Sequence, residues 1–407
     1  MAKKPIELLA PAGNMEKLQA AVYYGADAVY FAGPSFGLRA FAPNFSWLQL
    51  AEAISFCHRH GVKAYITVNV YAHNQDLEGL PSYIRHLAES GADAAIVADP
   101  GVLSVVKAEA PQLPVHLSTQ ANTTNKLSAR FWQEQGVSRV VLARELTRGE
   151  VTEIAKAVPD LELEVFVHGA MCISYSGRCL LSKFMTGRDA NKGECAQVCR
   201  WNFALVEEKR PGEYYPIAQD ERGTYILNSR DLCLLEYLPE LVEAGVRSFK
   251  IEGRMKSVYY VATVTKIWRE AIDSYLTDPD SFQVKKEWLE ELGKVSHRPY
   301  TSGFWASGGG EPRPALTHLE TSKYLRSYDF VGLVTGVDPG TGAFEVEARN
   351  PIDRGDRLEV VSPRGPVQEF IFPLERVNPN QTFTLSYQGL FANPPQVWSL
   401  LRRAKKS

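Results

Sequence analysis

The first half of the chain repeats one pattern of apolar and polar positions. An amphipathic segment with helical spacing ends at a glycine, and a short apolar, β-rich run follows almost at once. The five glycines, each with the run that follows it, are Gly25 before ADAVYFAG, Gly61 before VKAYITVNV, Gly91 before ADAAIVAD, Gly136 before VSRVVLARE and, much later, Gly245 before VRSFKIEGR. Glycine suits the left-handed residue that closes a helix, and apolar β-branched runs suit strands buried on both faces. The pattern therefore predicts helices alternating with parallel strands.

Further strands and helix starts fill the gaps in this repeat. Strand-like runs occupy 114–120 and 161–169, and capping-box spacing marks helix starts at Ser46 and Thr147. The count reaches about eight β/α units, which predicts an α/β fold with a TIM-like (β/α) barrel over residues 1–300. An open, doubly wound sheet is the alternative, because periodicity alone does not show closure.

The pattern changes in two places after this repeat. Residues 170–230 break the β/α rhythm and contain a cysteine cluster, so we expect a cysteine-rich insertion between the last two barrel strands. Residues 301–320 are rich in Gly and Pro and are predicted to be a linker. Short strands separated by turn residues follow over 321–407, which predicts a small C-terminal β-barrel domain.

Size and charge narrow the class of protein. A chain of 407 residues has room for a barrel and an appended domain, and a net charge of −2 excludes a globally basic nucleic-acid coat. No apolar run has the length of a signal peptide or of a membrane span. We therefore expect a cytoplasmic protein without a membrane partner.

Four of the six cysteines lie close together, at Cys172, Cys179, Cys195 and Cys199. In a reducing compartment such a cluster indicates metal or redox chemistry rather than disulfides. Four thiolates match the ligands of an iron–sulfur cluster, and equally those of a structural zinc. Only Cys195 and Cys199 form a tight pair, which favours the cluster over a zinc ribbon. Cys233, which we expect at the start of a helix, is the alternative fourth ligand.

Polar residues recur where the predicted strands end, the edge at which barrel enzymes carry out their chemistry. They include Asn69, Ser118, Gln120, Arg144, His168, Lys250, Glu252 and Arg254. Each of these residues taken alone could equally cap a strand or a helix. Together they indicate where a substrate pocket would lie.

The segment around the first cysteines carries a family resemblance. Glu164-x-Phe166-x-x-Gly169-Ala170-Met171-Cys172, continued by Gly177-x-Cys179-x-Leu181-Ser182, resembles the signature of the collagenase-like peptidase family U32. LLAPAGNMEKLQAAVYYGADAVYF, SFKIEGRMKS and SHRPYTSGF look like further motifs of the family. The resemblance covers residues 5–305, and the β-rich tail is similar to that of the longer members.

The resemblance implies two kinds of activity. The family is named for proteolysis, yet some members support RNA hydroxylation that does not use molecular oxygen. The cysteine region is most similar to the branch that hydroxylates the wobble uridine of tRNA to 5-hydroxyuridine. This similarity implies a tRNA partner, prephenate as co-substrate, and an iron–sulfur cluster of the [4Fe–4S] type on the four clustered cysteines, with zinc as the alternative.

Three other functions stay open. The first is a collagenase-like peptidase, and the second is hydroxylation of another RNA, such as ribosomal RNA. The third is a non-catalytic protein in which the metal only holds the insertion together, acting through a protein partner or as a homo-oligomer.

An RNA hydroxylase needs phosphate contacts and a stacking surface. Arg178, Arg200 and Trp201 in the cysteine region are the candidates, and a solvated charged surface is the ordinary alternative. A dicarboxylate such as prephenate needs fixed cations, and arginine binds carboxylates bidentately. The candidates near the predicted barrel mouth are Arg144 and Arg298 for substrate binding, and His168, Glu252, Arg254 and Lys250 for catalysis, with His168 and Glu252 as the proton-transfer groups.

Overall fold

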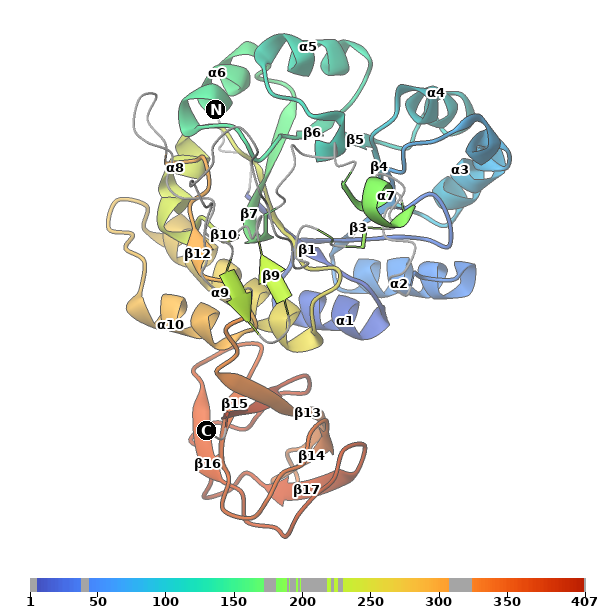
Figure 1. Cartoon of the computed structure of the whole chain (residues 1–407). Helices are drawn as coiled ribbons and strands as arrows, with labels where there is room; N and C mark the ends of the chain where they lie inside the picture. The colour runs from blue at the N-terminus through green and yellow to red at the C-terminus, as the bar shows by residue number, and fades with distance from the viewer. Residues whose placement is uncertain are drawn as a thin grey trace.

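The computed structural model describes residues 6–37, 44–171, 181–188, 190, 195–196, 198, 218–220, 223–225, 230–306 and 324–405. Within these residues the chain builds an α/β barrel and a smaller antiparallel sheet that packs against one side of it (Figure 1).

Eight parallel strands form the barrel. They are β1 (Glu7–Pro11), β2 (Ala28–Phe31), β3 (Lys63–Val68), β4 (Ala94–Val97), β5 (Val115–Leu117), β6 (Arg139–Val141), β7 (Glu162–Ala170) and β11 (Ser248–Ile251). Each strand pairs with the next, β7 pairs with β11, and β11 pairs with β1. The sheet is therefore closed, which confirms the (β/α) barrel and excludes the open sheet.

Helices surround the barrel strands and bury their apolar faces against them. They are α1 (Met15–Tyr23), α2 (Trp47–Arg59), α3 (Leu80–Glu89), α4 (Pro100–Glu109), α5 (Lys126–Glu134), α6 (Arg148–Ala157), α8 (Leu238–Glu243) and α9 (Val258–Thr277). The five glycines that were predicted to end helices all have positive φ, between 71° and 98°. Both predicted capping boxes form, at the starts of α2 and α6.

The predicted insertion falls between β7 and β11, the last two barrel strands. Its described parts include α7 (Leu181–Thr186), the two-stranded sheet of β8 (Ala218–Asp220) and β9 (Gly223–Tyr225), and β10 (Asp231–Cys233). β10 runs antiparallel to β7, and β12 (Tyr300–Thr301) pairs with β10. The prediction that Cys233 starts a helix is wrong, because its backbone pairs with β7 and extends the sheet.

The chain stays packed on the barrel beyond the predicted start of the linker at residue 301. After α10 (Lys286–Lys294) and β12, Trp305 is still buried in the main hydrophobic core. The remainder of the predicted linker, from 307 to 320, lies outside the described residues.

The C-terminal sheet has six antiparallel strands in the order β16-β15-β18-β13-β14-β17. Their bounds are β13 (Tyr328–Asp338), β14 (Ala343–Ala348), β15 (Arg357–Val361), β16 (Gln368–Ile371), β17 (Thr382–Ser386) and β18 (Leu400–Ala404). The sheet curls around a hydrophobic core of its own, which includes Phe344, Phe372 and Leu401. This agrees with the predicted β-rich domain.

The C-terminal sheet is fixed to the helices α1, α9 and α10. The hydroxyl of Tyr24, the residue that caps the end of α1, lies 2.7 Å from the carbonyl oxygen of Val361. Arg402 is fully buried and forms ion pairs with Glu359 of its own domain and with Glu291 of α10. Because buried polar groups and charges are paired across this contact, the two parts form one packed structure. Among the described residues, no helix is both long and apolar enough to cross a membrane.

Candidate active site at the carboxyl end of the barrel

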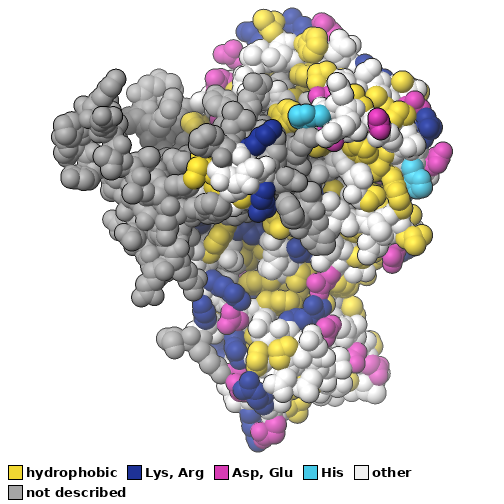
Figure 2. All heavy atoms as spheres, turned by 45° about the vertical axis from the view of Figure 1, so that its right-hand side comes forward, with side chains coloured by type: hydrophobic (Ala, Val, Ile, Leu, Met, Phe, Trp, Pro, Cys, Tyr) yellow, Lys and Arg dark blue, Asp and Glu magenta, His cyan; other side chains and the backbone are white. Residues whose placement is uncertain are grey.

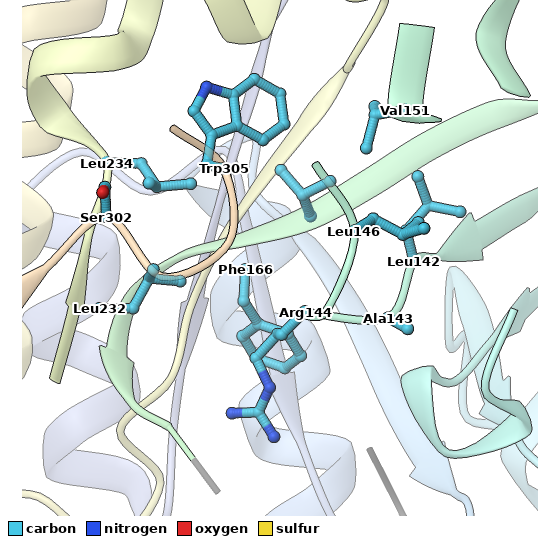
Figure 3. Close-up of a pocket in the computed structure, with 11 residues that line it drawn as sticks. Leu142, Ala143, Arg144, Leu146, Val151, Phe166, Leu232, Leu234, Ser302 and Trp305 are labelled. Atoms are coloured by element: carbon cyan, nitrogen blue, oxygen red, sulfur yellow. The ribbon is translucent and has the colours of Figure 1, made fainter. Parts of the chain in front are cut away.

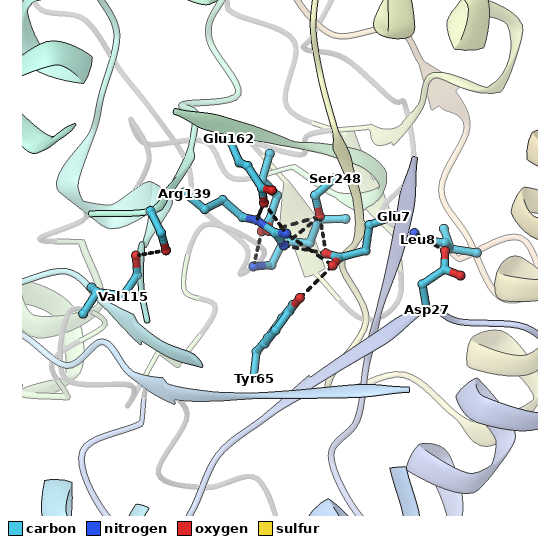
Figure 4. Close-up of polar contacts among 11 residues, drawn as sticks. Glu7, Leu8, Asp27, Tyr65, Val115, Arg139, Glu162 and Ser248 are labelled. Atoms are coloured by element: carbon cyan, nitrogen blue, oxygen red, sulfur yellow. Dashed lines mark hydrogen bonds and ion pairs between the residues drawn. The ribbon is translucent and has the colours of Figure 1, made fainter. Parts of the chain in front are cut away.

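The amino-terminal half of the barrel interior holds a network of buried charges (Figure 4). The Arg139 guanidinium lies 2.5 Å from Glu7, 2.7 Å from Glu162 and 3.3 Å from Glu164. The Tyr65 hydroxyl donates to Glu7 at 2.6 Å. Burial alone raises the pKa of Glu7, but the charge and hydrogen bonds of Arg139 outweigh it and hold that pKa below its usual value. The lowered pKa keeps the Glu7 carboxylate ionised.

Lys250 belongs to this network rather than to the rim of the barrel. Its Nζ lies 2.7 Å from Glu164 Oε1, and Glu164 is fully buried. The ammonium also lies 4.5 Å from the ring centroid of Tyr30 and 5.4 Å from that of Phe166. Lys250 was predicted to be a catalytic group near the mouth, and the structure places it one layer deeper, as a paired interior cation.

Phe166 connects this layer to the mouth. The Arg144 guanidinium lies 5.1 Å from the same ring centroid, and its Nη1 donates to the carbonyl oxygen of Ala170 at 2.8 Å. Arg144 is half-buried, and its guanidinium lies beside the carboxyl ends of β6 and β7. A cation held in this way can bind a carboxylate or a phosphate.

Arg144 also borders a pocket between β6, β7 and the segment after β12 (Figure 3). Its other lining residues are mostly apolar and include Leu142, Leu146, Val151, Leu234 and Trp305. The cavity volume is about 20 Å³, which is room for about one water molecule. This pocket is therefore too small to be the substrate site.

His168, the predicted proton-transfer residue, is buried at the carboxyl end of β7. Its ring lies 5.1 Å from the ring of Tyr300 and 6.1 Å from that of Tyr260. Among the described residues, neither ring nitrogen has a hydrogen-bond partner. Burial, with smaller effects from nearby His297 and Lys256, lowers the pKa of His168 to about 3. The imidazole is thus neutral near pH 7, able to donate one hydrogen bond and to accept another.

The two other predicted residues on this side, Glu252 and Arg254, follow β11. The Glu252 amide donates to the carbonyl oxygen of His168 at 2.8 Å. A Cβ at Gly169, whose φ is +113°, would come within 2.5 Å of the Glu252 carbonyl oxygen, so only glycine fits there. This close approach fixes Glu252 beside His168.

Arg254 is 5% exposed, and its side chain contacts the loop between β2 and α2. Its Nη2 donates to Asn44 Oδ1 at 3.1 Å. The ammonium of Lys17 lies 3.4 Å from the carbonyl oxygen of Arg254. Burial lowers the pKa of Lys17, which the sequence analysis did not single out. The Lys17 ammonium therefore lies beside the backbone of Arg254, after the end of β11.

Arg298, a predicted substrate-binding residue, is buried beside an aspartate that sequence reasoning missed. The Arg298 Nε lies 3.8 Å from Asp231 Oδ1, and its backbone amide donates to Asp231 Oδ2 at 3.2 Å. Lys256 Nζ lies 3.7 Å from Asp231 as well. Asp231 is one carboxylate in a loop-like stretch of the sequence, and only the pairing of β10 with β7 and β12 reveals its position. Arg298 thus has a structural partner.

The cysteine site is described only in part. Cys195 is exposed, and Cys233 is half-buried on β10, opposite His168 in the strand pairing. Cys172, Cys179 and Cys199, together with Arg178, Arg200 and Trp201, lie outside the described residues.

Within the described parts of the chain, no three His, Cys, Asp or Glu side chains are placed to hold a metal ion. Burial raises the pKa of the Cys233 thiol to about 12, so without a metal it is a neutral thiol. Soft thiolate donors fit an iron–sulfur cluster or zinc, and β7 ends two residues before Cys172 in the sequence. The four-cysteine ligand set stays a prediction.

The opposite side of the mouth has neutral polar side chains at the ends of β3 and β5, with Asp99 after β4 between them. The loop after β5 contains the short helix η2 (Thr119–Ala121) and is tied to its neighbours. Asn69 Nδ2 donates to Ser118 Oγ at 3.3 Å, and the Tyr71 hydroxyl donates to the Gln120 carbonyl oxygen at 2.6 Å. The mouth therefore has Arg144 and Arg254 after β6 and β11, Lys17 in the first turn of α1 after β1, and neutral polar groups at the ends of β3 and β5.

A closed (β/α) barrel with its candidate chemistry at the carboxyl end, a segment rich in cysteine between its last two strands and a C-terminal β-sheet defines the class of this protein. The sequence model of peptidase family U32 matches residues 13–312, and that of the peptidase family U32 C-terminal domain matches residues 326–390. The chain belongs to peptidase family U32.

Three curated relatives show which members of the family it is similar to. It is 43% identical to tRNA hydroxylation protein P1 of Bacillus subtilis, over 92% of this chain and 87% of that protein. It is 37% identical to tRNA hydroxylation protein P of Escherichia coli, over 91% of this chain and 88% of that protein. It is also 33% identical to a 23S rRNA 5-hydroxycytidine synthase of Escherichia coli, over 92% of this chain but 55% of that protein.

Proposed function

We propose that this protein hydroxylates the wobble uridine of tRNA to 5-hydroxyuridine, without molecular oxygen, with prephenate as co-substrate and an iron–sulfur cluster on its cysteines. The observation that carries the proposal is the 43% identity, over nearly the whole chain, to a protein named for tRNA hydroxylation. The similarity to an rRNA hydroxycytidine synthase supports the same chemical class, the hydroxylation of a pyrimidine in RNA.

The charges at the mouth suit a dicarboxylate co-substrate. Arg144 on one side, and Arg254 with Lys17 on the other, supply cations beside the strand ends. Arginine forks bind carboxylates bidentately. In the proposal these residues hold prephenate, while Arg298 positions the β10 segment through Asp231.

The proposal assigns the cluster to Cys172, Cys179, Cys195 and Cys199, with Cys233 as the alternative fourth ligand. Replacing a carbon-bound hydrogen by a hydroxyl group is a two-electron oxidation, so a redox partner is required. Bound to these thiolates, an iron–sulfur cluster would supply electron transfer or a Lewis-acidic iron. The proposal gives proton transfer to His168 and Glu252, and a backbone hydrogen bond from the Glu252 amide to the His168 carbonyl oxygen supports this assignment.

RNA binding in this protein cannot come from its total charge, which is −2. Figure 2 shows one face of the molecule, where Lys and Arg side chains gather at the junction between the barrel and the C-terminal sheet and along one flank of that sheet. Half-buried Arg349 bridges this junction through Glu16 of α1. Because the two parts are packed as one structure, a tRNA could contact both at once.

The experiment that tests the proposal uses protein purified without oxygen and an unmodified tRNA transcript. We expect 5-hydroxyuridine among the nucleosides, measured by mass spectrometry, only when prephenate is present. Iron, zinc and the absorption spectrum are measured on the same sample. Hydroxylation that is equally fast without prephenate, or in a protein holding one zinc and no iron, contradicts the corresponding part of the proposal.

Variants separate the parts of the site. Arg254→Ala is expected to raise the KM for prephenate by about tenfold or more, because a charged hydrogen bond to the carboxylate is lost. Full activity in this variant would remove Arg254 from the site. The same preparation is tested on ribosomal RNA fragments and on gelatin, since cleavage of gelatin would favour the peptidase and modified cytidine would favour the ribosomal substrate.

A further inference from the structure

The neutral side of the barrel mouth contains a buried amide that no contact accounts for. Gln120 is 8% exposed, and its side-chain oxygen Oε1 is buried without a hydrogen-bond partner among the described residues. Two further buried oxygens in the same loop, Asn122 Oδ1 and Thr123 Oγ1, also have none. Leaving a buried acceptor unbonded costs free energy, and such groups are rare in native structures. A ligand that bonds them is one explanation.

The loop that carries Gln120 is rigid on its backbone side. The backbone amide of Gln120 donates to Ser118 Oγ at 3.4 Å, and the backbone carbonyl oxygen of Gln120 accepts from the Tyr71 hydroxyl at 2.6 Å. On the other side, Thr119 Oγ1 donates to the Leu142 carbonyl oxygen at 3.2 Å. The ends of β3, β5 and β6 therefore hold the backbone of Gln120 in place, while its side-chain oxygen has no partner in the described part of the chain. Binding sites are commonly built in this way, from a fixed frame and an unsatisfied functional group.

The chemistry of this loop differs from that of the rest of the mouth. Residues 118–123 read STQANT and contain no charge. The cations Arg144 and Arg254 follow β6 and β11, and Lys17 lies in the first turn of α1, which follows β1. A carboxylate or a phosphate would bind to those cations, whereas an amide with one acceptor and one donor suits an uncharged heterocycle that offers a donor beside an acceptor. Uracil offers N3–H between two carbonyl oxygens.

We propose that Gln120 binds the pyrimidine base that this protein modifies, with Oε1 accepting the N3–H of uracil and the amide nitrogen donating to a neighbouring carbonyl. This inference rests on the proposed function and names the part of the site that selects the base. The cations at the ends of β1, β6 and β11 then take the co-substrate, and the target base lies on the β3–β5 side.

The first variant is Gln120→Met, which keeps the volume of the side chain and removes its hydrogen bonds. We expect the KM for tRNA to rise by about tenfold or more, since a bidentate contact to a base discriminates by at least that factor. The KM for prephenate should stay within about twofold of the wild-type value. Gln135→Met is the matched control, because Gln135 is exposed and ends α5 at the far end of the barrel, and it should leave both constants unchanged.

A stability measurement distinguishes binding from a structural role. Because the oxygen is unpaired, Gln120→Met should unfold at the same urea concentration as the wild type or at a higher one. A fall in the midpoint would show that the amide has a structural partner and would overturn the proposal. Gln120→Glu, which removes the amide donor and adds a charge, should weaken tRNA binding at least as much as Gln120→Met.

The remaining outcomes are also decisive. An increase in the KM for prephenate alone would assign Gln120 to the co-substrate and overturn the inference. Binding of a labelled anticodon stem–loop with uridine at the wobble position is measured separately from turnover, and equal affinities of wild type and Gln120→Met would overturn it too. If the wild type, loaded with its metal, forms no hydroxylated nucleoside in any RNA, the proposed function itself fails, which is a different result from equal affinities.

Discussion

The two ends of the barrel interior differ in how far their polar side chains are paired. At the amino end, buried Arg139, Glu164 and Lys250 and half-buried Glu7 are joined by ion pairs and hydrogen bonds. Beside them, His116 Nδ1 is a single buried nitrogen without a partner among the described residues. At the carboxyl end, both nitrogens of His168 and the side-chain oxygens of Gln120, Asn122 and Thr123 are buried without a partner among the described residues. Unpaired buried groups reduce stability, so the carboxyl end is the end arranged for a ligand.

The largest expected effect comes from breaking the paired end. Glu164→Gln removes the carboxylate that lies 2.7 Å from Lys250 and 3.3 Å from Arg139, and leaves a buried ammonium without its charge partner. We expect the free energy of unfolding to fall by about 3–5 kcal/mol, measured by urea denaturation.

The control for this variant is Glu153→Gln, which removes the same charge from an exposed pair with Lys126. A surface pair of this kind contributes at most about 1 kcal/mol. If the two variants lost equal stability, the interior network would not be what holds the amino end together.

The second prediction uses pH to test the unpaired end. In the folded protein the pKa of His168 is lowered from 6.5 to about 3, so the unfolded chain binds a proton between these values and the folded chain does not. Stability therefore falls as the pH drops below 6.5. Between pH 7 and pH 5 this one residue should cost about 2 kcal/mol, at about 1.4 kcal/mol for each unit of pKa difference.

His168→Phe should remove that part of the pH dependence and leave stability at pH 7 equal or higher. The measurement is the difference in unfolding free energy between pH 7 and pH 5, compared for variant and wild type. Since the pKa of His116 is also lowered by burial, its contribution is present in both proteins and cancels. An unchanged pH difference in His168→Phe would mean that His168 is protonated in the folded state.

The same two ends also show which parts of the structure can be predicted from the sequence. The glycines and apolar runs were sufficient to predict the barrel, because helix ends and buried strands leave local signals in the sequence. The depth of Lys250 in the barrel could not be predicted in this way. A sequence places a strand end only to within a few residues, and a shift of two residues along a strand moves a side chain by one layer of the barrel interior. The predicted rim residue is therefore an interior partner of Glu164.

The pairing of the charges was also beyond prediction. Glu7 and Arg139 lie at the starts of their strands, where a charged residue is ordinarily exposed, and Glu164 is the third residue of β7. The strands β6 and β7 are direct neighbours, but only closure of the sheet through β11 brings β1, with Glu7, beside them. At the other end, Gln120 was one of several polar residues at strand ends, and no local pattern in the sequence marked its side-chain oxygen as one without a partner among the described residues.

The smallest expected change in stability comes from removing single hydroxyl groups, one at each end of the barrel interior. Ser248 Oγ at the amino end lies 2.9 Å from Glu7, 3.2 Å from Glu164 and 3.3 Å from Arg139. Thr123 Oγ1 at the carboxyl end is buried and has no partner among the described residues.

Ser248→Ala should therefore lower the unfolding free energy by about 1.5 kcal/mol, since hydrogen bonds to charged groups are lost. Thr123→Val keeps the shape and removes an unbonded hydroxyl, so it should leave stability unchanged or raise it by about 1 kcal/mol. Both values come from urea denaturation at the same pH. Opposite signs would confirm that the barrel is paired at one end and open to a ligand at the other, and a loss in Thr123→Val as large as that in Ser248→Ala would contradict the contrast.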